Sequence, residues 1–255
     1  MAIERRNPLA GRPLTSARPL PAASRLSPRP SARPPARPAP VRVPGPRLLP
    51  LVLWPALLTL AVTLLRLVGE LRGWSPATFS RLPGGGLSPL GITWLAPLVG
   101  FYLGWRLQRA GVRAPSVAVA LGLPAAALVV GPLVAALLQR HFKPSWTSGF
   151  ALWGAVSVVV AALAFAAWPT LGRLLLAYAF AARVPVAIVM ALAIWKAWGT
   201  HYDAPPPGFP PMPLLRRWLW TGLLPQGTIW VAWTIATGAL LGPLGFRIAA
   251  LLRRR

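Results

Sequence analysis

Long apolar stretches separated by short polar segments dominate the chain from residue 48 onward. Six of them are long enough to cross a bilayer: 48–68, 89–107, 116–138, 148–168, 174–198 and 218–241. A span takes roughly 20 apolar residues, because the hydrocarbon layer is about 30 Å thick and a helix rises about 1.5 Å per residue. The stretches lack the strict alternation of a membrane β-barrel, so each is predicted to be a helix. We therefore predict an all-α fold, a polytopic bundle of six transmembrane helices.

Residues 1–46 differ in composition, with nine arginines and a proline every few residues. Proline removes a backbone donor and restricts its neighbour, so we predict a disordered tail at 1–46, a bundle at 47–246 and a short basic tail at 247–255. The first interpretation of the N-terminal tail is a topological anchor or an extension from a mis-assigned start codon. A targeting segment and binding to anionic lipid headgroups are alternatives. A nucleic-acid arm is disfavoured, because the tail has no aromatic residue for base stacking.

The arginines and lysines between the stretches indicate the orientation, since cytoplasmic segments retain positive residues. With the N terminus inside, the inner segments hold eighteen of these residues and the outer segments seven. We therefore expect both termini in the cytoplasm, and we assign the protein to the cytoplasmic (inner) membrane of a bacterium.

Composition narrows the chemistry that the chain can perform. There are 27 lysines and arginines against three acidic residues, and there is no cysteine, which excludes thiolate nucleophiles and cysteine-ligated metals. Glu70, His141, His201 and Asp203 fall on the predicted outer side. Two histidines and a carboxylate are possible metal ligands, but His141 is distant in sequence and the spacing matches no metal signature. We predict neither a metal nor a cofactor.

The segment 198–213 is the strongest candidate for a functional site. Its prolines stiffen a loop that carries His201, Tyr202 and Asp203, and Asp203 is expected to cap a turn. We expect the loop to pack over the outer ends of the second and sixth helices, near Trp94 and Trp230, and to form a ligand site there. The alternative is a spacer that sets the angle between the fifth and sixth helices.

Arg183 lies near the middle of the fifth stretch. An arginine there costs about 2.5 to 3.5 kcal/mol on insertion scales, so a partner or a water-filled cavity is expected. Pro185 frees the carbonyl of Ala181, which we expect to accept from the guanidinium. Glu70 lies about 10 Å away along the membrane normal by helical rise, and its alternative partner is Arg66, one turn earlier. Arg183 is therefore either an anion site or a structural residue.

Two local patterns occur in the second and sixth stretches. Residues 87–96 and 223–232 share Leu, Pro, Gly, Trp and Ala at equivalent positions, which suggests parallel, equivalent helices. The alternative is that both segments use the same sequence solution for entry into a helix, because ten residues are too few to establish a duplication. Two pairs of glycines have the four-residue spacing of close helix packing: Gly100 with Gly104, and Gly238 with Gly242. Glycine is common enough in this chain that such pairs are expected by chance.

Three classes of function remain. We favour a non-catalytic scaffold, assembly or regulatory protein, with the lipid bilayer and a second copy or another membrane protein as partners. The alternative is a small-solute or anion permease or channel subunit with Arg183 in the pathway. Its candidate ligand-binding residues are Arg183, His201, Asp203, Tyr202, Glu70, Trp94 and Trp230. An intramembrane enzyme ranks third, because Ser145 and Ser148 near His141 have no evident orienting acid.

Overall fold

The computed structural model of the protein describes residues 48–83, 88 and 90–254. Within these ranges the chain is helical and contains no strand, which confirms the predicted all-α fold. The elements are α1 (Leu48–Leu71), α2 (Leu95–Arg109), α3 (Val117–Phe142), α4 (Trp146–Ala167), α5 (Pro169–Lys196), α6 (Leu214–Trp218), the π-helical turn η2 (Leu219–Leu223), α7 (Leu224–Gly227) and α8 (Ile229–Arg253). The predicted tail at 1–46, with its proposed lipid contacts, lies outside the described residues.

Among the described residues, five helices rather than the predicted six have the length and apolar composition of membrane spans. They are Pro50–Leu71, Val117–Phe142, Trp146–Ala167, Pro169–Lys196 and Leu214–Arg253. The chain is therefore a multi-pass helical membrane protein.

The difference is α2, which replaces the predicted span 89–107. It has 15 residues and is about 22 Å long, shorter than the roughly 30 Å hydrocarbon layer. Gly91 lies in the non-helical segment before it, and Pro97 occupies its first turn, where a missing amide donor costs least.

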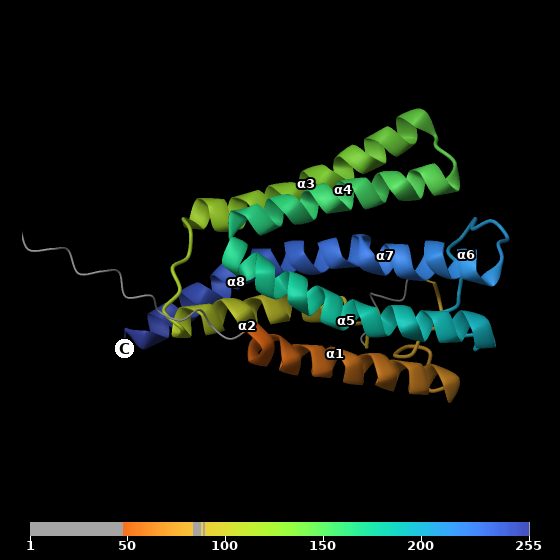
Figure 1. Cartoon of the computed structure of the whole chain (residues 1–255), viewed down its shortest axis with the longest axis horizontal. Coiled ribbons are helices and arrows are strands. Elements are labelled where there is room, and N and C mark those ends of the chain that lie inside the picture. Colours follow the sequence, from red (N-terminus) through yellow and green to blue (C-terminus); the bar gives the residue numbers. More distant parts are fainter. Residues whose placement is uncertain (1–47, 84–87, 89, 255) are drawn as a thin grey trace, which may run out of the picture. The chain divides into compact units, whose positions relative to one another are not determined.

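The helices alternate in direction. In Figure 1, α2 returns antiparallel to α1, α3 and α4 form a hairpin, and α5 is followed by the return through α6, η2, α7 and α8. The start of α1 and the end of α8 consequently lie at one end of the bundle, and the 197–213 loop lies at the other. The assignment of the first end to the cytoplasm stays a prediction.

The glycine pairs of α2 and α8 face each other. A Cβ built on Gly100 would lie 2.2 Å from the carbonyl oxygen of Gly238, and one on Gly104 would lie 1.9 Å from that of Gly242. Neither position has room for a side chain, so the two backbones are in direct contact. The matching order of these contacts along both helices shows that α2 and α8 are parallel, as the sequence similarity between 87–96 and 223–232 predicted.

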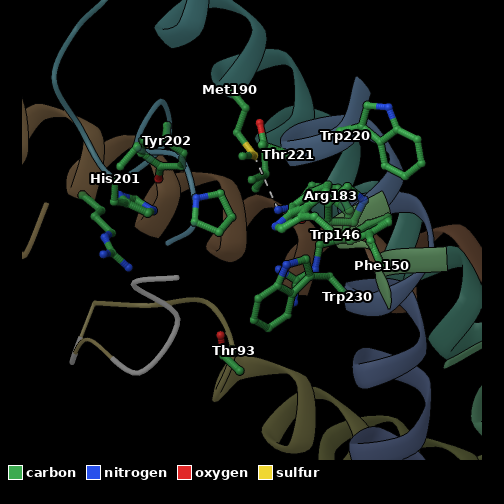
Figure 2. Close-up of a pocket in the computed structure, with 16 residues that line it drawn as sticks. Thr93, Trp146, Phe150, Arg183, Met190, His201, Tyr202, Trp220, Thr221 and Trp230 are labelled. Atoms are coloured by element: carbon green, nitrogen blue, oxygen red, sulfur yellow. Dashed lines mark hydrogen bonds between the residues drawn. The ribbon is translucent and has the colours of Figure 1, made fainter. Parts of the chain in front are cut away.

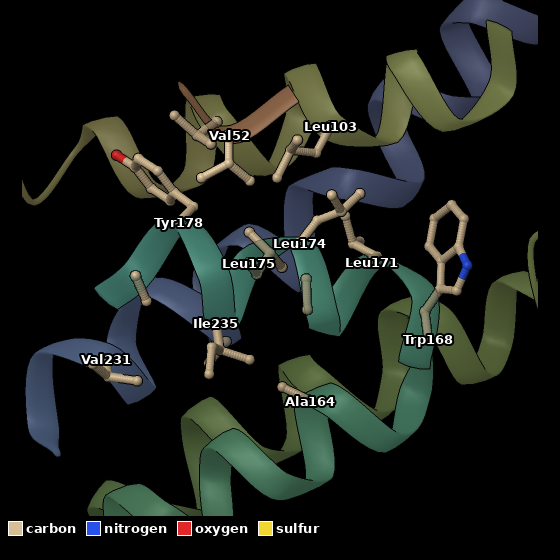
Figure 3. Close-up of a cluster of buried hydrophobic side chains, with 14 of the residues drawn as sticks. Val52, Leu103, Ala164, Trp168, Leu171, Leu174, Leu175, Tyr178, Val231 and Ile235 are labelled. Atoms are coloured by element: carbon tan, nitrogen blue, oxygen red, sulfur yellow. The ribbon is translucent and has the colours of Figure 1, made fainter. Parts of the chain in front are cut away.

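The core surrounds α5. Figure 3 shows Leu171, Leu174, Leu175 and Tyr178 of this helix directed towards neighbouring helices, and all four side chains are almost completely buried. The hydroxyl of Tyr178 lies 2.8 Å from that of Thr59 on α1. α1 and α8 therefore both pack against α5.

Candidate functional site

A cavity of about 230 Å³ lies between the 197–213 loop and the helices around it. Its polar lining includes Arg66, Thr93, Arg183, His201 and Gln226, and its aromatic lining comprises Trp146, Phe150, Tyr202, Trp220 and Trp230. Figure 2 shows His201 and Tyr202 on one side of the cavity and Arg183 with Trp230 on the other. The site thus combines cationic groups with flat apolar walls.

The loop forms a turn that its own residues stabilise. Ala197 ends α5 in a left-handed conformation, with φ of 52°, and Gly199 follows with φ of 66°. The carboxylate of Asp203 accepts hydrogen bonds from the amides of Gly199 and Thr200 at 2.9 and 2.7 Å and from the Thr200 hydroxyl at 2.8 Å. Arg217 of α6 donates to the Asp203 carbonyl. The predicted turn-capping role of Asp203 is confirmed, because these three donors belong to the loop itself.

This turn holds two side chains against α1. The Tyr202 hydroxyl donates to the carbonyl of Thr63 at 3.0 Å, and the ring is buried. The backbone amide and Nδ1 of His201 lie 2.8 and 2.6 Å from the carboxylate of Glu70. The sequence placed this docking over the second and sixth helices. The hydrogen bonds go to α1 instead, because Glu70 and the Thr63 carbonyl supply buried acceptors there.

Glu70 is a buried carboxylate whose oxygens accept hydrogen bonds from Arg66 and His201. Nε of Arg66 lies 2.8 Å from Oε1, which also faces His201, and neither Arg66 nor Glu70 is appreciably exposed. Arg66 further donates to the carbonyl of Ser80 at 3.1 Å, and Arg81 donates to the backbone carbonyl of Glu70. The predicted pairing of Glu70 with Arg66 is confirmed. Such a carboxylate is stabilised in its ionised form by several charge-assisted hydrogen bonds.

His201 presents one nitrogen to Glu70 and leaves the other available. Because Glu70 accepts at 2.6 Å, the neutral ring carries its proton on Nδ1, and Nε2 is then an acceptor without a hydrogen bond to any described residue. Burial lowers the pKa of His201 below its ordinary value, although the hydrogen bond to Glu70 acts in the opposite direction. Burial therefore favours the neutral form of the imidazole. Burial also raises the pKa of Tyr202, which keeps its phenol protonated.

Arg183 lies deep in the bundle, about 20 Å along α5 from Lys196. Its side chain is 5% exposed, and its guanidinium lies over the ring of Trp230, 5.2 Å from the centroid. Nη2 is 3.4 Å from the Thr234 hydroxyl, and Nε has no hydrogen-bond partner. The interior position agrees with the prediction, whereas the hydrogen bond goes to Thr234 rather than to the carbonyl of Ala181. In the described part of the chain no carboxylate lies within ion-pair distance of Arg183.

Gln226 is the second incompletely bonded polar side chain in the cavity. It is buried, its Oε1 has no partner, and its Nε2 is 3.6 Å from the sulfur of Met190. The helix is irregular on both sides of it, with the π-helical turn η2 before it and Thr228 at φ −118° and ψ −75° after it. Such π-helical turns are frequent at functional sites.

The structure brings together most, but not all, of the predicted ligand-binding residues. Arg183, His201, Tyr202 and Trp230 line the cavity, Glu70 lies behind His201, and Asp203 stabilises the turn that positions it. Trp94 is 44% exposed and does not line this cavity. His141 is exposed at the end of α3. Among the described residues, no three His, Asp or Glu side chains are grouped as metal ligands would be.

Sequence reasoning missed several lining residues: Thr93, Trp146, Phe150, Trp220 and Gln226. Gln226 had a signal, because it is an uncharged polar residue within an apolar stretch and lies in the segment that resembles 87–96. The aromatic residues had none, since tryptophan near the end of a span is also explained by the membrane interface.

The arrangement suits binding of an anion better than covalent chemistry. Glu70 and His201 have the geometry of an orienting acid and a base, but no hydroxyl in the described residues is hydrogen-bonded to Nε2. Comparisons with protein-family models, curated proteins and solved structures found no match for the chain. The functional argument therefore depends on the geometry of this cavity.

Proposed function

We propose that the protein binds a small organic anion in the cavity, as a permease or channel subunit with Arg183 in the pathway. The observation that supports this most directly is the buried guanidinium of Arg183, which has no carboxylate partner among the described residues. A scaffold or assembly protein needs no such charge inside its bundle. The permease interpretation is therefore placed ahead of the scaffold.

The contacts of Arg183 offset only part of the free-energy cost of placing its charge inside the membrane. Insertion scales assign about 2.5 to 3.5 kcal/mol to an arginine at this depth. The distance of 3.4 Å to Thr234 is longer than a normal N–H···O bond, and Nε has no partner. A cation–π contact contributes about 0.5 to 2 kcal/mol. An anion would supply charge-assisted hydrogen bonds of about 1.5 to 3 kcal/mol each to the atoms that now lack them.

The walls indicate the rest of the ligand. Trp146, Phe150 and Trp220 form a cluster with ring centroids 5.6 to 6.1 Å apart, and Trp230 lies beneath the guanidinium. Flat aromatic surfaces favour a ring or another apolar body beside the anionic group. The volume of about 230 Å³ is several times the roughly 30 Å³ that one water occupies in the liquid. A carboxylate carrying a single ring fits this description.

The position of the cavity suits a pathway. Pro206 in the loop is exposed and lines it, while Arg183 lies about 20 Å along α5 from the end of that helix. The interrupted helix around Gln226 forms one wall. Membrane transporters place substrate sites near the bilayer midplane beside discontinuous helices.

Thermal unfolding of the purified protein in phosphatidylcholine nanodiscs tests the proposal, with benzoate as the anionic probe and benzamide as its neutral analogue. Benzoate is expected to raise the unfolding temperature, by an amount that corresponds to about 2.7 kcal/mol at a hundredfold excess over its Kd. Benzamide is expected to have little effect. Arg183→Met should fold and lose the response to benzoate, whereas Arg216→Met, which changes an exposed arginine on α6, should keep it.

A second arm distinguishes a free anion from a lipid headgroup. If phosphatidylglycerol added to the nanodiscs stabilises the wild type and suppresses the effect of benzoate, the natural anion is a lipid. An equal response to benzoate in wild type and Arg183→Met, or no response in the wild type, would overturn the proposal.

A further inference from the structure

We propose that the cavity takes up a proton together with the anion, and that Nε2 of His201 is the atom that accepts it. The inference rests on the proposed function, because it concerns the same cavity. Its basis is geometric: Glu70 holds Nδ1 of His201 at 2.6 Å, the ring lines the cavity opposite Arg183, and Nε2 is not bonded to any described residue.

Charged and titratable groups surround His201 on several elements. They are Arg66 and Glu70 on α1, Arg81 after α1, Arg183 on α5, Tyr202 and Asp203 in the loop, and Arg217 on α6. Asp203 and Arg217 are engaged with the backbone of the turn, and Arg81 is engaged with the Glu70 carbonyl. Of the charged groups, Arg66 and Arg183 line the cavity, whereas Glu70 contacts the imidazole from behind. The carboxylates of Glu70 and Asp203 favour the protonated imidazole electrostatically, and Arg66 opposes it.

Charge balance explains why the proton and the anion bind together. Arg66 and Glu70 compensate each other, whereas Arg183 lines the cavity without a carboxylate partner among the described residues. Protonating His201 would place a second positive charge in a buried site, which desolvation and repulsion both oppose. A bound anion compensates Arg183, so the same proton then adds the first net positive charge rather than the second. By linkage, protonation strengthens anion binding by the same factor.

The step is a simple proton transfer. A hydronium ion gives its proton to the Nε2 lone pair, water is released, and nothing is oxidised or reduced. The imidazolium then has two N–H donors, of which Nδ1–H stays on Glu70 and Nε2–H faces the ligand. Glu70 therefore accepts from Nδ1–H in both protonation states of the ring.

Isothermal titration of benzoate into the nanodisc-embedded protein at pH 7 measures the proton directly. Bis-Tris and Tris serve as buffers, because they differ in ionisation enthalpy and are cations that cannot occupy an anion site. The apparent binding enthalpy should differ between them by an amount that corresponds to uptake of up to about one proton per benzoate. His201→Gln should bind benzoate more weakly and show no buffer dependence. His141→Gln, which changes the exposed histidine at the end of α3, should match the wild type.

The outcomes separate the two proposals. Benzoate binding with no buffer dependence in the wild type overturns the proton coupling and leaves the anion site intact, whereas absence of binding overturns the proposed function itself. Equal proton uptake in His201→Gln overturns the assignment to His201.

A second measurement leaves His201 unchanged. The chain has two histidines, so His141→Gln gives a protein with a single imidazole whose NMR titration can be followed. Benzoate should raise the pKa of His201 in that protein and benzamide should not. An unchanged titration with bound benzoate also overturns the coupling.

Discussion

Replacing Glu70 with glutamine tests whether the buried cluster fixes the loop that closes the cavity. The carboxylate faces three donors, namely Nε of Arg66, Nδ1 of His201 and the His201 amide. Glutamine keeps the volume but offers one acceptor oxygen and one NH2 group. If its oxygen takes the place of Oε1, the NH2 group faces the His201 amide, so two donors oppose each other. The guanidinium of Arg66 also loses this carboxylate.

The structure indicates that Glu70→Gln should cause a loss of stability near the upper end of what single substitutions usually cause. Removing one partner of a buried ion pair typically costs about 3 to 5 kcal/mol, because the other charge stays buried. Arg66 is 3% exposed, so water cannot replace the carboxylate without local opening, although the Ser80 carbonyl still accepts from it. For a domain of this size, about 3 to 5 kcal/mol corresponds to a fall of roughly 6 to 20 °C in unfolding temperature.

A double-mutant cycle with Arg66→Met is the decisive assay. Glu70→Gln and Arg66→Met should each destabilise strongly, and the double variant should recover much of the loss, because no unpaired charge remains. Arg72→Gln changes an exposed arginine just beyond α1 and should stay within about 0.5 kcal/mol of wild type. Fully additive losses, or a Glu70→Gln protein as stable as the Arg72→Gln control, would refute the reasoning.

Three further outcomes are expected. Gly100→Ala should lower stability by about 1 to 3 kcal/mol in thermal unfolding, because its Cβ would meet the backbone of α8. Gly122→Ala, whose Cβ would have nothing within 4 Å, should be neutral or gain up to about 1 kcal/mol. Burial lowers the pKa of His201, so just below the ordinary value of about 6.5 the unfolded chain binds more protons than the folded chain. The free energy of unfolding should therefore fall as the pH drops through that region, and His201→Gln should weaken this dependence. If the sequence-based orientation is right, a thiol reagent outside intact cells will label Pro205→Cys and not Arg254→Cys; the reverse pattern would contradict it.

The helices were largely predictable because their cause is local. A run of apolar residues that matches the bilayer thickness is sufficient to form a helix, since the backbone has no other partner in lipid. Prediction failed at α2, where the apolar run from 89 to 107 suggested a full span and the helix begins only at Leu95. Contacts between helices were harder to predict from the sequence. Lipid-facing and buried surfaces are both apolar, so hydrophobicity does not identify partners, and only the structure shows that Gly100 and Gly238 meet.

In the candidate site, too, local contacts could be predicted from the sequence and contacts between distant residues could not. The Arg66–Glu70 pair could be predicted because the residues are four apart on one helix. The contact between Glu70 and His201 spans 131 positions and depends on the turn capped by Asp203, which no spacing encodes. Arg183 stood out in the sequence because of its depth, but its position over Trp230 depends on how α5 packs against α8.

The irregular last helix accounts for the place of the cavity. A continuous helix over the 40 residues of Leu214–Arg253 would be about 60 Å long, roughly twice the hydrocarbon thickness. The π-helical turn η2 and the irregular backbone at Thr228 divide it, so its two parts can follow different neighbours. The part around Trp218 is held to α5 by a hydrogen bond of 2.9 Å from the Trp218 indole to the carbonyl of Ala187, and α8 is held to α2 by the glycine contacts. Gln226 and Trp230 lie on opposite sides of the irregularity and both line the cavity. The wall opposite the loop is therefore built where the helix is least regular, which places polar and aromatic groups beside a charge that apolar packing would not accommodate.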